Sequence, residues 1–332
     1  MNANKHFDII AIGDTVIDAF IKLKDAEVHC DIKHEDCQLC LPFGGKVPYE
    51  DVYIVPGTGN SANAAISFAK LGLHSALISS VGDDQNGDNC LKALREAGVD
   101  TAFVRREHGK KTNYHYVLWY GDERTILVKH EKFAHSLPAF GEPEWIYLSS
   151  LGENTEKIHE EILEYLKTHP KVKLAFQPGT FQIKAGYGKM APLYRRTEIF
   201  FCNRVEAKKI LGTDKDGCLD LAKLLTDLGP KTVVVTDADR GAWAHTAGKS
   251  WFIPTICKKE DAIERTGAGD AFASAVVSAL AQGEDLENAL CWGPVNADSV
   301  IRFVGPQAGL LNKKELLKRV SELKNFKLKE LK

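Results

Sequence analysis

Short apolar stretches alternate with amphipathic ones along most of this chain. The short stretches are rich in Val, Ile and Phe and end at glycine or polar residues, which is typical of strands buried on both faces. We predict such strands at 7–12, 75–81, 145–149, 172–176, 198–202 and 232–236. Apolar residues at helical spacing predict helices at 86–97, 155–168, 204–211, 218–228, 271–281, 286–300 and 313–323. This alternation predicts an α/β fold with a mostly parallel central sheet and helices on both of its faces.

Two segments interrupt this rhythm. Within 15–55, apolar and polar residues alternate from position 17 to 23, and a second apolar run follows at 52–55. Within 101–130, two β-rich runs at 113–120 and 125–129 flank Gly121-Asp122-Glu123, which favours a hairpin turn. We expect the two segments to form a small, half-exposed sheet.

The most informative motif is Thr266-Gly267-Ala268-Gly269-Asp270, directly before the predicted helix 271–281. Its glycines allow a tight turn and a close approach to a ligand, and the first N–H groups of a helix attract anions. Asp270 beside such a turn can accept the proton of a hydroxyl that attacks a phosphate. The alternative is an ordinary helix start with an acidic residue in its first turn, and the motif alone does not decide between the two.

Two further segments open helices with polar residues. Gly57-Thr58-Gly59-Asn60-Ser61-Ala62-Asn63 precedes an apolar helix that ends before Gly72, and its amides can bind a polyhydroxylated ligand. An ordinary capped helix explains it equally simply. Asn203 and Glu206 follow a predicted strand at a spacing that suits a hydrated Mg²⁺. The same spacing is that of a capping box, and both interpretations can hold at once.

Taken in this order, the motifs resemble the ribokinase-like family of sugar and nucleoside kinases, also called PfkB-type carbohydrate kinases. The resemblance covers nearly the whole chain, and several ordered matches are stronger evidence than any single motif. It implies a single kinase domain over 1–332, built as a three-layer α/β/α sandwich. The segments at about 15–55 and 101–130 would form a small β-sheet lid over the substrate. In several members this sheet also forms the contact of a homodimer.

The resemblance also implies an activity, the transfer of the γ-phosphoryl group of ATP to a hydroxyl group. Asp270 would be the base, and the N–H groups of residues 267–269 would form the anion hole. Mg²⁺ would be held, mostly through water, by Glu206 and Asn203. The implied substrate-binding residues are Asp14, Asp18, Gly57, Gly59 and Asn63. The implied nucleotide-binding residues are Asn203, Thr236, Gly241, Thr266 and Asn296.

Three departures from the family pattern qualify these expectations. Ala238 lies in the nucleotide turn where the family has glycine, and its methyl group needs a permitted backbone angle. Glu264-Arg265 replaces the usual opening of the last motif, which leaves a monovalent-cation site as an open question. Arg265 either contacts phosphate or is simply solvated. Thr58 is an extra residue between the paired glycines, so the sugar contacts carry less weight than the catalytic ones.

The acceptor is predicted as a small sugar or sugar derivative. The alternative is a nucleoside, because the aromatic residues at 114, 116, 119 and 120 could stack on a base. A third possibility is a family member that binds a sugar or nucleotide without turnover. A phosphorylated sugar would require a basic pocket, for which the sequence shows no pattern.

Composition narrows the function classes. The chain has 332 residues and a net charge of −2, which argues against binding to nucleic acid. Its apolar runs are too short to span a membrane, and no leader-like segment is apparent, so we expect a cytoplasmic protein. The eight cysteines are expected as thiols in a reducing compartment. His29, Cys30, His34, Cys37 and Cys40 have a spacing that zinc accepts, although ordinary thiols are the favoured interpretation.

Overall fold

The computed structural model describes residues 6–30, 37–121, 123–256, 261–323 and 326–331. Within them, the six predicted strands and four further ones, β7, β14, β15 and β16, form one sheet in the order β16-β15-β14-β13-β12-β11-β10-β1-β6-β7. The sheet is parallel from β7 to β13, and antiparallel strands extend it at the β13 edge. The strands are β1 (Ile9–Ile12), β6 (Ser75–Gly82), β7 (Val104–Glu107), β10 (Trp145–Leu148), β11 (Lys173–Phe176), β12 (Ile199–Asn203), β13 (Thr232–Thr236), β14 (Ala242–Thr246), β15 (Lys249–Ile253) and β16 (Lys329–Leu331).

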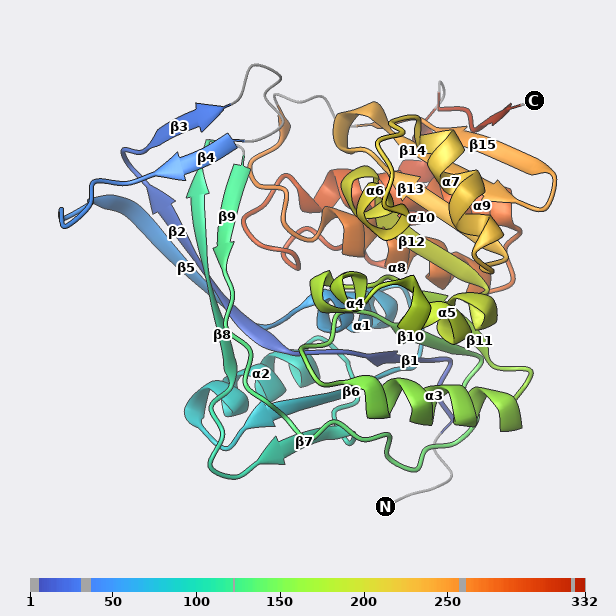
Figure 1. The fold of residues 1–332 in the computed structure, drawn as a ribbon, viewed down its shortest axis with the longest axis horizontal. Coiled ribbons are helices and arrows are strands. Elements are labelled where there is room, and N and C mark those ends of the chain that lie inside the picture. The colour runs from blue at the N-terminus through green and yellow to red at the C-terminus, as the bar shows by residue number, and fades with distance from the viewer. Residues whose placement is uncertain (1–5, 31–36, 122, 257–260, 324–325, 332) are drawn as a thin grey trace.

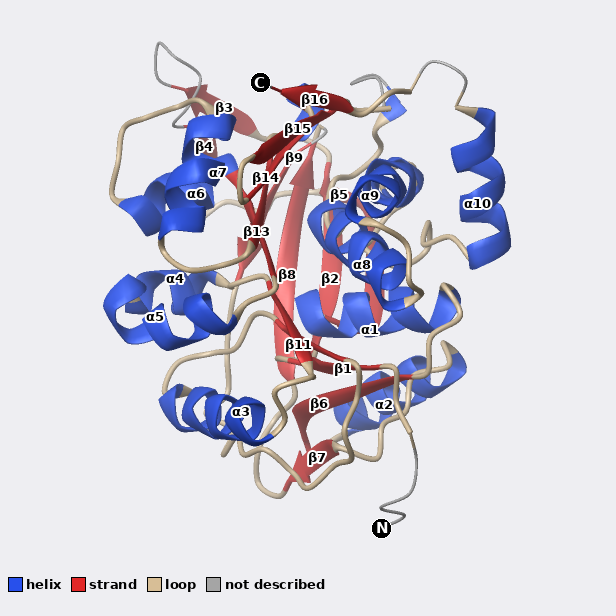
Figure 2. Cartoon of the chain, turned by 90° about the vertical axis from the view of Figure 1, so that its right-hand side faces the viewer, coloured by secondary structure: helices blue, strands red, loops and turns tan. Residues whose placement is uncertain are grey.

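Helices cover both faces of this sheet, which confirms the predicted three layers (Figure 2). One layer holds α1 (Asn60–Lys70), α2 (Gln85–Glu96), α8 (Ala268–Ala281), α9 (Leu286–Val300) and α10 (Lys313–Glu322). The other holds α3 (Glu156–Thr168), α4 (Thr180–Ala185), α5 (Tyr187–Arg196), α6 (Arg204–Leu211) and α7 (Cys218–Asp227). Successive residues of a strand point to opposite faces, so β1 contributes Ile9 and Ala11 to one core and Ile10 and Ile12 to the other.

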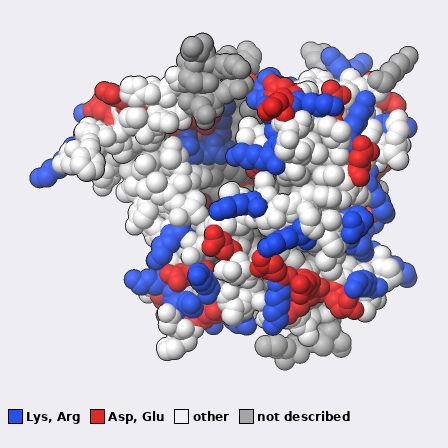
Figure 3. Space-filling model, viewed as in Figure 1, with Lys and Arg blue, Asp and Glu red and all other residues white. Residues whose placement is uncertain are grey.

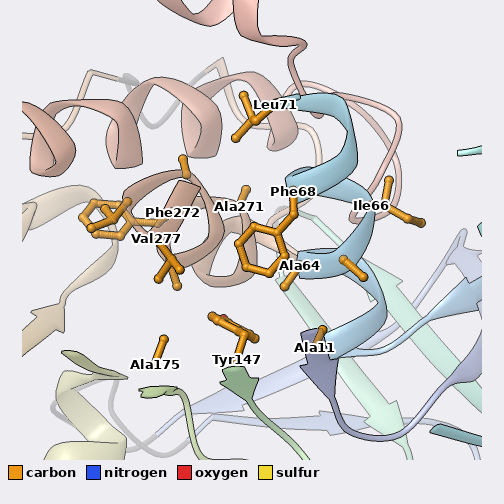
Figure 4. Packing of buried hydrophobic residues seen from close by; sticks show 14 of the residues in the cluster. Ala11, Ala64, Ile66, Phe68, Leu71, Tyr147, Ala175, Ala271, Phe272 and Val277 are labelled. Carbon is orange, nitrogen blue, oxygen red and sulfur yellow. The ribbon is translucent and has the colours of Figure 1, made fainter. Parts of the chain in front are cut away.

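The core between the sheet and the first helix layer is tightly built from small and aromatic residues. Figure 4 shows Phe68 of α1 pointing toward Tyr147 of β10, and their ring centroids lie 5.3 Å apart in an edge-on arrangement. Helix α8 is buried over most of its length, and small residues such as Ala271 let it pack closely against α1 and α9. The start of α8 is therefore fixed relative to the carboxyl ends of the parallel strands.

A separate four-stranded sheet, here called the small sheet, projects from the sandwich (Figure 1). Its order is β5-β2-β8-β9, with β2 (Val16–Leu23), β5 (Tyr49–Thr58), β8 (Asn113–Tyr120) and β9 (Glu123–Leu127). These strands come from the two segments that the sequence separated from the main rhythm. Because the side chains of a strand alternate, one face of the small sheet carries Asp18, His115 and Arg124, and the opposite face carries Ile54 and Tyr116.

The hairpin of β3 (Glu27–Cys30) and β4 (Cys37–Cys40) corrects one expectation about the cysteines. Its register places Cys30 opposite Cys37, and the two form a disulfide, so the expected thiols are wrong for this pair. Cys40 is free. Among the described residues no group of His, Cys, Asp and Glu is arranged to hold a metal ion, and His34 lies outside the described residues.

Candidate active site

Two connected cavities lie at the carboxyl ends of the parallel strands, where open α/β sheets bind ligands. The first, of about 450 Å³, lies between the small sheet and the start of α8. The second, of about 320 Å³, lies between α8, α9 and the turn after β13. Figure 3 shows the hollow between the small sheet and the main body, with Lys and Arg atoms inside it and across its mouth. Both cavities are lined by Arg124, Asn203, Thr236, Arg265, Gly269 and Phe272.

Asp270 lies in the first turn of α8, next to the place where the two cavities meet, which we call the junction. It is 6% exposed and lines the first cavity. Burial raises the pKa of its carboxyl group above the usual range, while three amide donors act in the opposite direction. A buried carboxylate held by directed hydrogen bonds is a suitable base for a hydroxyl group that enters the cavity.

The three donors are the side-chain amides of Asn60, Asn63 and Gln177. Asn60 Nδ2 donates to Asp270 Oδ1 at 3.0 Å, and Gln177 Nε2 donates to the same oxygen at 3.1 Å. Asn63 Nδ2 donates to Oδ2 at 2.8 Å. The hydroxyl of Tyr147 in turn donates to Gln177 Oε1, which fixes the orientation of that amide. Asp270 is therefore held in place from two sides of the cavity.

The turn before Asp270 presents backbone N–H groups to the junction of the cavities. Gly267 caps α8 with φ of 82°, and a Cβ at this position would collide with Pro306. Ala268 N donates to the carbonyl of Arg265 at 3.3 Å, whereas the amides of Gly267 and Gly269 make no hydrogen bond within the described part of the chain. The predicted anion hole is thus built mainly around the two glycines.

The part of the first cavity formed by the small sheet and the loop after β1 carries carboxylates and histidines. Asp14 follows β1 and Asp18 lies on β2, and both are buried. His130 Nδ1 lies 3.1 Å from Asp14 Oδ2, and His115 Nδ1 lies 3.4 Å from Asp18 Oδ1. His135 Nε2 lies 3.4 Å from Asp14 Oδ1, and burial lowers the pKa of the His135 ring. We call Asp14, Asp18, His115 and His130 the histidine end.

The other predicted substrate residues are placed unequally. Gly59 and Asn63 line the first cavity, and Asn63 is fixed by Gln307, whose Nε2 donates to Asn63 Oδ1 at 3.0 Å. Gly57 does not line the cavity; its carbonyl accepts from the same Gln307 side chain at 2.8 Å. The extra residue Thr58 is buried in β5 and donates to the carbonyl of Val16. Gly57 therefore shapes the loop and does not face the ligand.

Asn203 and Glu206 form the capping box of α6. Asn203 Oδ1 accepts from Glu206 N at 2.9 Å, and Glu206 Oε2 accepts from Asn203 N at 2.9 Å. Both side chains also line the first cavity. Burial raises the pKa of Glu206, with Asp270 adding to the shift. Glu206 Oε1 makes no hydrogen bond within the described residues, so it can accept from water bound to Mg²⁺, which fits the donor set that this ion prefers.

The second cavity is lined mainly by apolar atoms and by the turn after β13. Ala238 adopts φ of 46°, in the left-handed region that residues other than glycine adopt only uncommonly. Gly241 has φ of 103°, and a Cβ there would lie 2.5 Å from the carbonyl oxygen of Ile253. Thr236 and Gly241, which the sequence suggested as nucleotide-binding residues, both line this cavity.

Asn296 is found elsewhere. It is fully buried and lines neither of these cavities. Its Nδ2 donates to the carbonyl of Ala271 and to Ser67 Oγ, and its Oδ1 accepts from Leu311 N. These contacts join α9 to α8 and α1, so we leave Asn296 out of the proposed site.

Two arginines lie where the cavities meet. Arg124 comes from β9, and its Nε lies 3.6 Å from the buried carboxylate of Glu264. Glu264 also accepts from the backbone and hydroxyl groups of Thr266, the residue that opens the glycine turn. Arg265 lies next to them and pairs with Glu123 at 3.4 Å. The sequence suggested Arg265 as a phosphate contact but gave no sign of Arg124, because that residue comes from a distant strand.

The fold is that of solved ribokinase structures. The structure of Arabidopsis thaliana ribokinase complexed with ribose and ATP superposes with a TM-score of 0.76, covering 95% of this chain and 99% of that one at 17% identity. The sequence profile of the pfkB family carbohydrate kinases matches residues 41–313. The chain belongs to this family and is a carbohydrate kinase.

Characterised relatives are similar along most of their length. The ATP-dependent 6-phosphofructokinase of Thermoanaerobacterium thermosaccharolyticum is 24% identical over 323 residues, which cover 91% of this chain and 90% of the relative. The ribokinase of Bacillus subtilis is 26% identical over 271 residues, covering 79% and 86%. One of these relatives is named for a phosphorylated acceptor and the other for a free sugar, so similarity alone leaves the acceptor of this chain open. Within the described residues, no helix has the length and hydrophobicity needed to cross a bilayer.

Proposed function

We propose that this protein transfers the γ-phosphoryl group of ATP to a hydroxyl group of a small sugar or sugar derivative, with Asp270 as the base. The observation that carries the proposal is the position of Asp270: buried, held by three amides, and next to the turn where the two cavities meet. The nucleotide occupies the second cavity beside Thr236 and Gly241, and the acceptor occupies the first.

The chemistry follows from this arrangement. The acceptor oxygen attacks the γ-phosphorus and loses its proton to Asp270 as the new O–P bond forms. The bond from the γ-phosphorus to the bridging oxygen breaks, and ADP leaves with that electron pair. The amides of Gly267 and Gly269 stabilise the charge on the transferred group, with that of Ala268 turned partly away. Arg124 and Arg265 add positive charge on the opposite side of the junction.

Mg²⁺ supplies charge neutralisation on the phosphates when it is bound. Glu206 and Asn203 would hold it through water, and their capping box fixes both side chains next to the junction of the two cavities. Dependence on a monovalent cation is the open question left by Glu264-Arg265, and replacement of K⁺ by a bulky organic cation tests it.

The nucleoside alternative loses part of its support. Tyr114 and Tyr116 lie on the outer face of the small sheet with their ring centroids 5.1 Å apart, and neither ring lines the cavities. Trp119 is buried, and its Nε1 donates to the carbonyl of Gly121. These aromatics are therefore not placed to stack on a base in the first cavity. Nucleosides nevertheless belong in the acceptor panel.

We also propose that residues 1–332 act as one kinase domain with the small sheet as its lid. The outer face of the small sheet exposes Val52, Ile54, Tyr116 and Leu127, which suits a homodimer contact. Sedimentation equilibrium at micromolar concentration tests this, and a monomer would contradict it. A cytoplasmic location remains a prediction.

The test of the proposed function is ADP release from Mg-ATP across sugars, sugar phosphates and nucleosides. We expect release that depends on an acceptor and falls about a thousandfold in Asp270→Asn, because a general base contributes roughly that much. Asp285→Asn, which lies outside both cavities and keeps a side-chain oxygen to cap α9, is the control. Acceptor-dependent release that survives Asp270→Asn would overturn the role of Asp270.

A further inference from the structure

The histidine end of the first cavity contains buried polar atoms without hydrogen-bond partners. Both carboxylate oxygens of Asp14, Nδ1 of His130 and Nε2 of His115 make no hydrogen bond among the described residues. The carboxylate and the His130 ring are close, at 3.1 Å, but their relative orientation is not that of a hydrogen bond. Buried polar groups in folded proteins nearly always have hydrogen-bond partners. An unpaired cluster in the lining of a cavity therefore indicates that a ligand supplies the missing partners.

The side chains come from three separate parts of the chain and converge on one place. His115 on β8 lies directly across from Asp18 on β2 in the parallel register of the small sheet. His130 follows β9 and packs edge-on against Phe181 of α4, with ring centroids 5.2 Å apart. The rings of His115 and His130 are 5.3 Å apart, so one small ligand can reach both His–Asp pairs.

The charge of this end selects among acceptors. Asp14 and Asp18 contribute two carboxylates, and the cationic Arg124 and Arg265 lie instead at the junction with the second cavity. A phosphate group has only acceptor oxygens and would face these carboxylates without a fixed cation. A sugar hydroxyl both donates and accepts, so it can donate to a carboxylate oxygen while accepting from an imidazole N–H.

We infer that His130 and His115, paired with Asp14 and Asp18, are the specificity-determining residues of this kinase. They bind neighbouring uncharged hydroxyl groups of the acceptor and discriminate against a phosphorylated one. The inference rests on the proposed function, because it concerns the acceptor of that same reaction. It separates this chain from relatives that act on sugar phosphates.

The first test uses the unmodified protein and matched acceptors. Ribose is compared with ribose 5-phosphate, and fructose with fructose 6-phosphate, within a wider panel of free sugars, polyols and nucleosides. We expect a neutral acceptor to give Asp270-dependent ADP release, with the kcat/KM of its phosphorylated counterpart at least tenfold lower. Asp270-dependent release that prefers a phosphorylated acceptor would overturn this inference and leave the proposed function intact. If no acceptor in the panel supports ADP release, the result counts against both this inference and the proposed function.

The second test is His130→Phe, which keeps a planar ring and removes its polar atoms. We expect KM for the neutral acceptor to rise about 10- to 100-fold with kcat within about threefold, because the variant leaves a bound hydroxyl group and the neighbouring Asp14 carboxylate without their partner. A neutral acceptor should raise the Tm of the unmodified protein and lose most of this effect in the variant.

Two further variants make the second test specific. His130→Asn keeps a polar atom in the same place and should recover part of the affinity. His108→Phe changes a 97% exposed histidine outside the cavity and should leave KM unchanged. An unchanged acceptor KM in folded His130→Phe would show that water alone satisfies the histidine end. If that variant does not fold, the acceptor panel decides alone.

Discussion

The two ends of the first cavity differ in how far the protein satisfies its own polar groups. At the reacting end, Asp270 accepts three hydrogen bonds from amides, two of which are themselves oriented by Tyr147 and Gln307. At the histidine end, the oxygens of Asp14 and the facing nitrogen of His130 make no such bonds among the described residues. The first end is preorganised for a transition state, and the second is completed by the acceptor.

This difference separates catalysis from recognition along one cavity. Groups that act on the reacting atoms gain from rigidity, because a misplaced donor loses transition-state stabilisation. Groups that select the acceptor discriminate better when the protein itself does not pair them, because a wrong ligand then leaves their hydrogen-bonding atoms without partners. Changes at the reacting end should lower kcat, and changes at the histidine end should raise KM.

The largest of the expected effects that follow comes from Gly267→Ala. The added methyl group collides with Pro306 and requires a left-handed backbone angle, so the glycine turn must shift. We expect kcat to fall about 100- to 1,000-fold, as when one donor of an anion hole is removed. The measurement is steady-state ADP release at saturating acceptor.

A matched control separates this effect from backbone strain. Gly248 in the β14–β15 turn has nearly the same φ, 83° against 82°, but open space around it. Gly248→Ala should cost about 1 kcal/mol of stability and leave kcat unchanged. Equal kcat in the two variants would show that the turn at Gly267 is not the anion hole.

An intermediate effect is expected from Glu206→Gln. The amide keeps an oxygen for the capping box but loses the charge that attracts hydrated Mg²⁺. We expect the Mg²⁺ concentration for half-maximal activity to rise about 10-fold, within the range found when residues supporting a metal are changed. Glu315→Gln alters the equivalent position in the capping box of α10 and should have no such effect. An identical Mg²⁺ dependence in both variants would remove Glu206 from the metal site.

The smallest effect, and the most diagnostic of how Asp270 is tuned, is expected from Gln177→Met. Burial raises the pKa of Asp270, and the Gln177 amide lowers it by stabilising the carboxylate. Removing that amide should raise the pKa further, and the acidic limb of kcat should move to higher pH by about one unit, since one such hydrogen bond is worth about 1.4 kcal/mol. Gln282→Met, a change at the opposite end of α8, is the control. An acidic limb that stays in place, or moves to lower pH, would contradict this account of Asp270.

The reacting end could be predicted from the sequence because its motifs are local. The turn before Asp270 and the pair Asn203 and Glu206 each lie within a few residues of one another, so spacing alone determines their geometry. The parallel strands from β6 to β13 were equally visible, because burial on both faces produces continuous apolar runs, whereas the edge strand β7 is largely polar and was missed. The strands β14 to β16 were not predicted, since they are short and carry mixed polar and apolar residues at the sheet edge.

The histidine end could not be predicted in the same way. The pairing of β2 with β8 places His115 opposite Asp18, and the segment after β9 brings His130 to Asp14. Gln177 follows β11, 93 positions before the carboxylate that it contacts. The disulfide between Cys30 and Cys37 likewise depends on the register of β3 with β4. Contacts of this kind are fixed by tertiary structure, and no local sequence pattern predicts them.

The most direct test of the central claim is to follow phosphoryl transfer itself by ³¹P NMR. The protein is incubated with Mg-ATP and the best acceptor of the panel, in parallel with Asp270→Asn. We expect the unmodified protein to convert ATP into equal amounts of ADP and a sugar phosphate ester, and the variant to form about a thousandfold less of both in the same time. Ester formation by Asp270→Asn at a rate close to that of the unmodified protein would contradict the account.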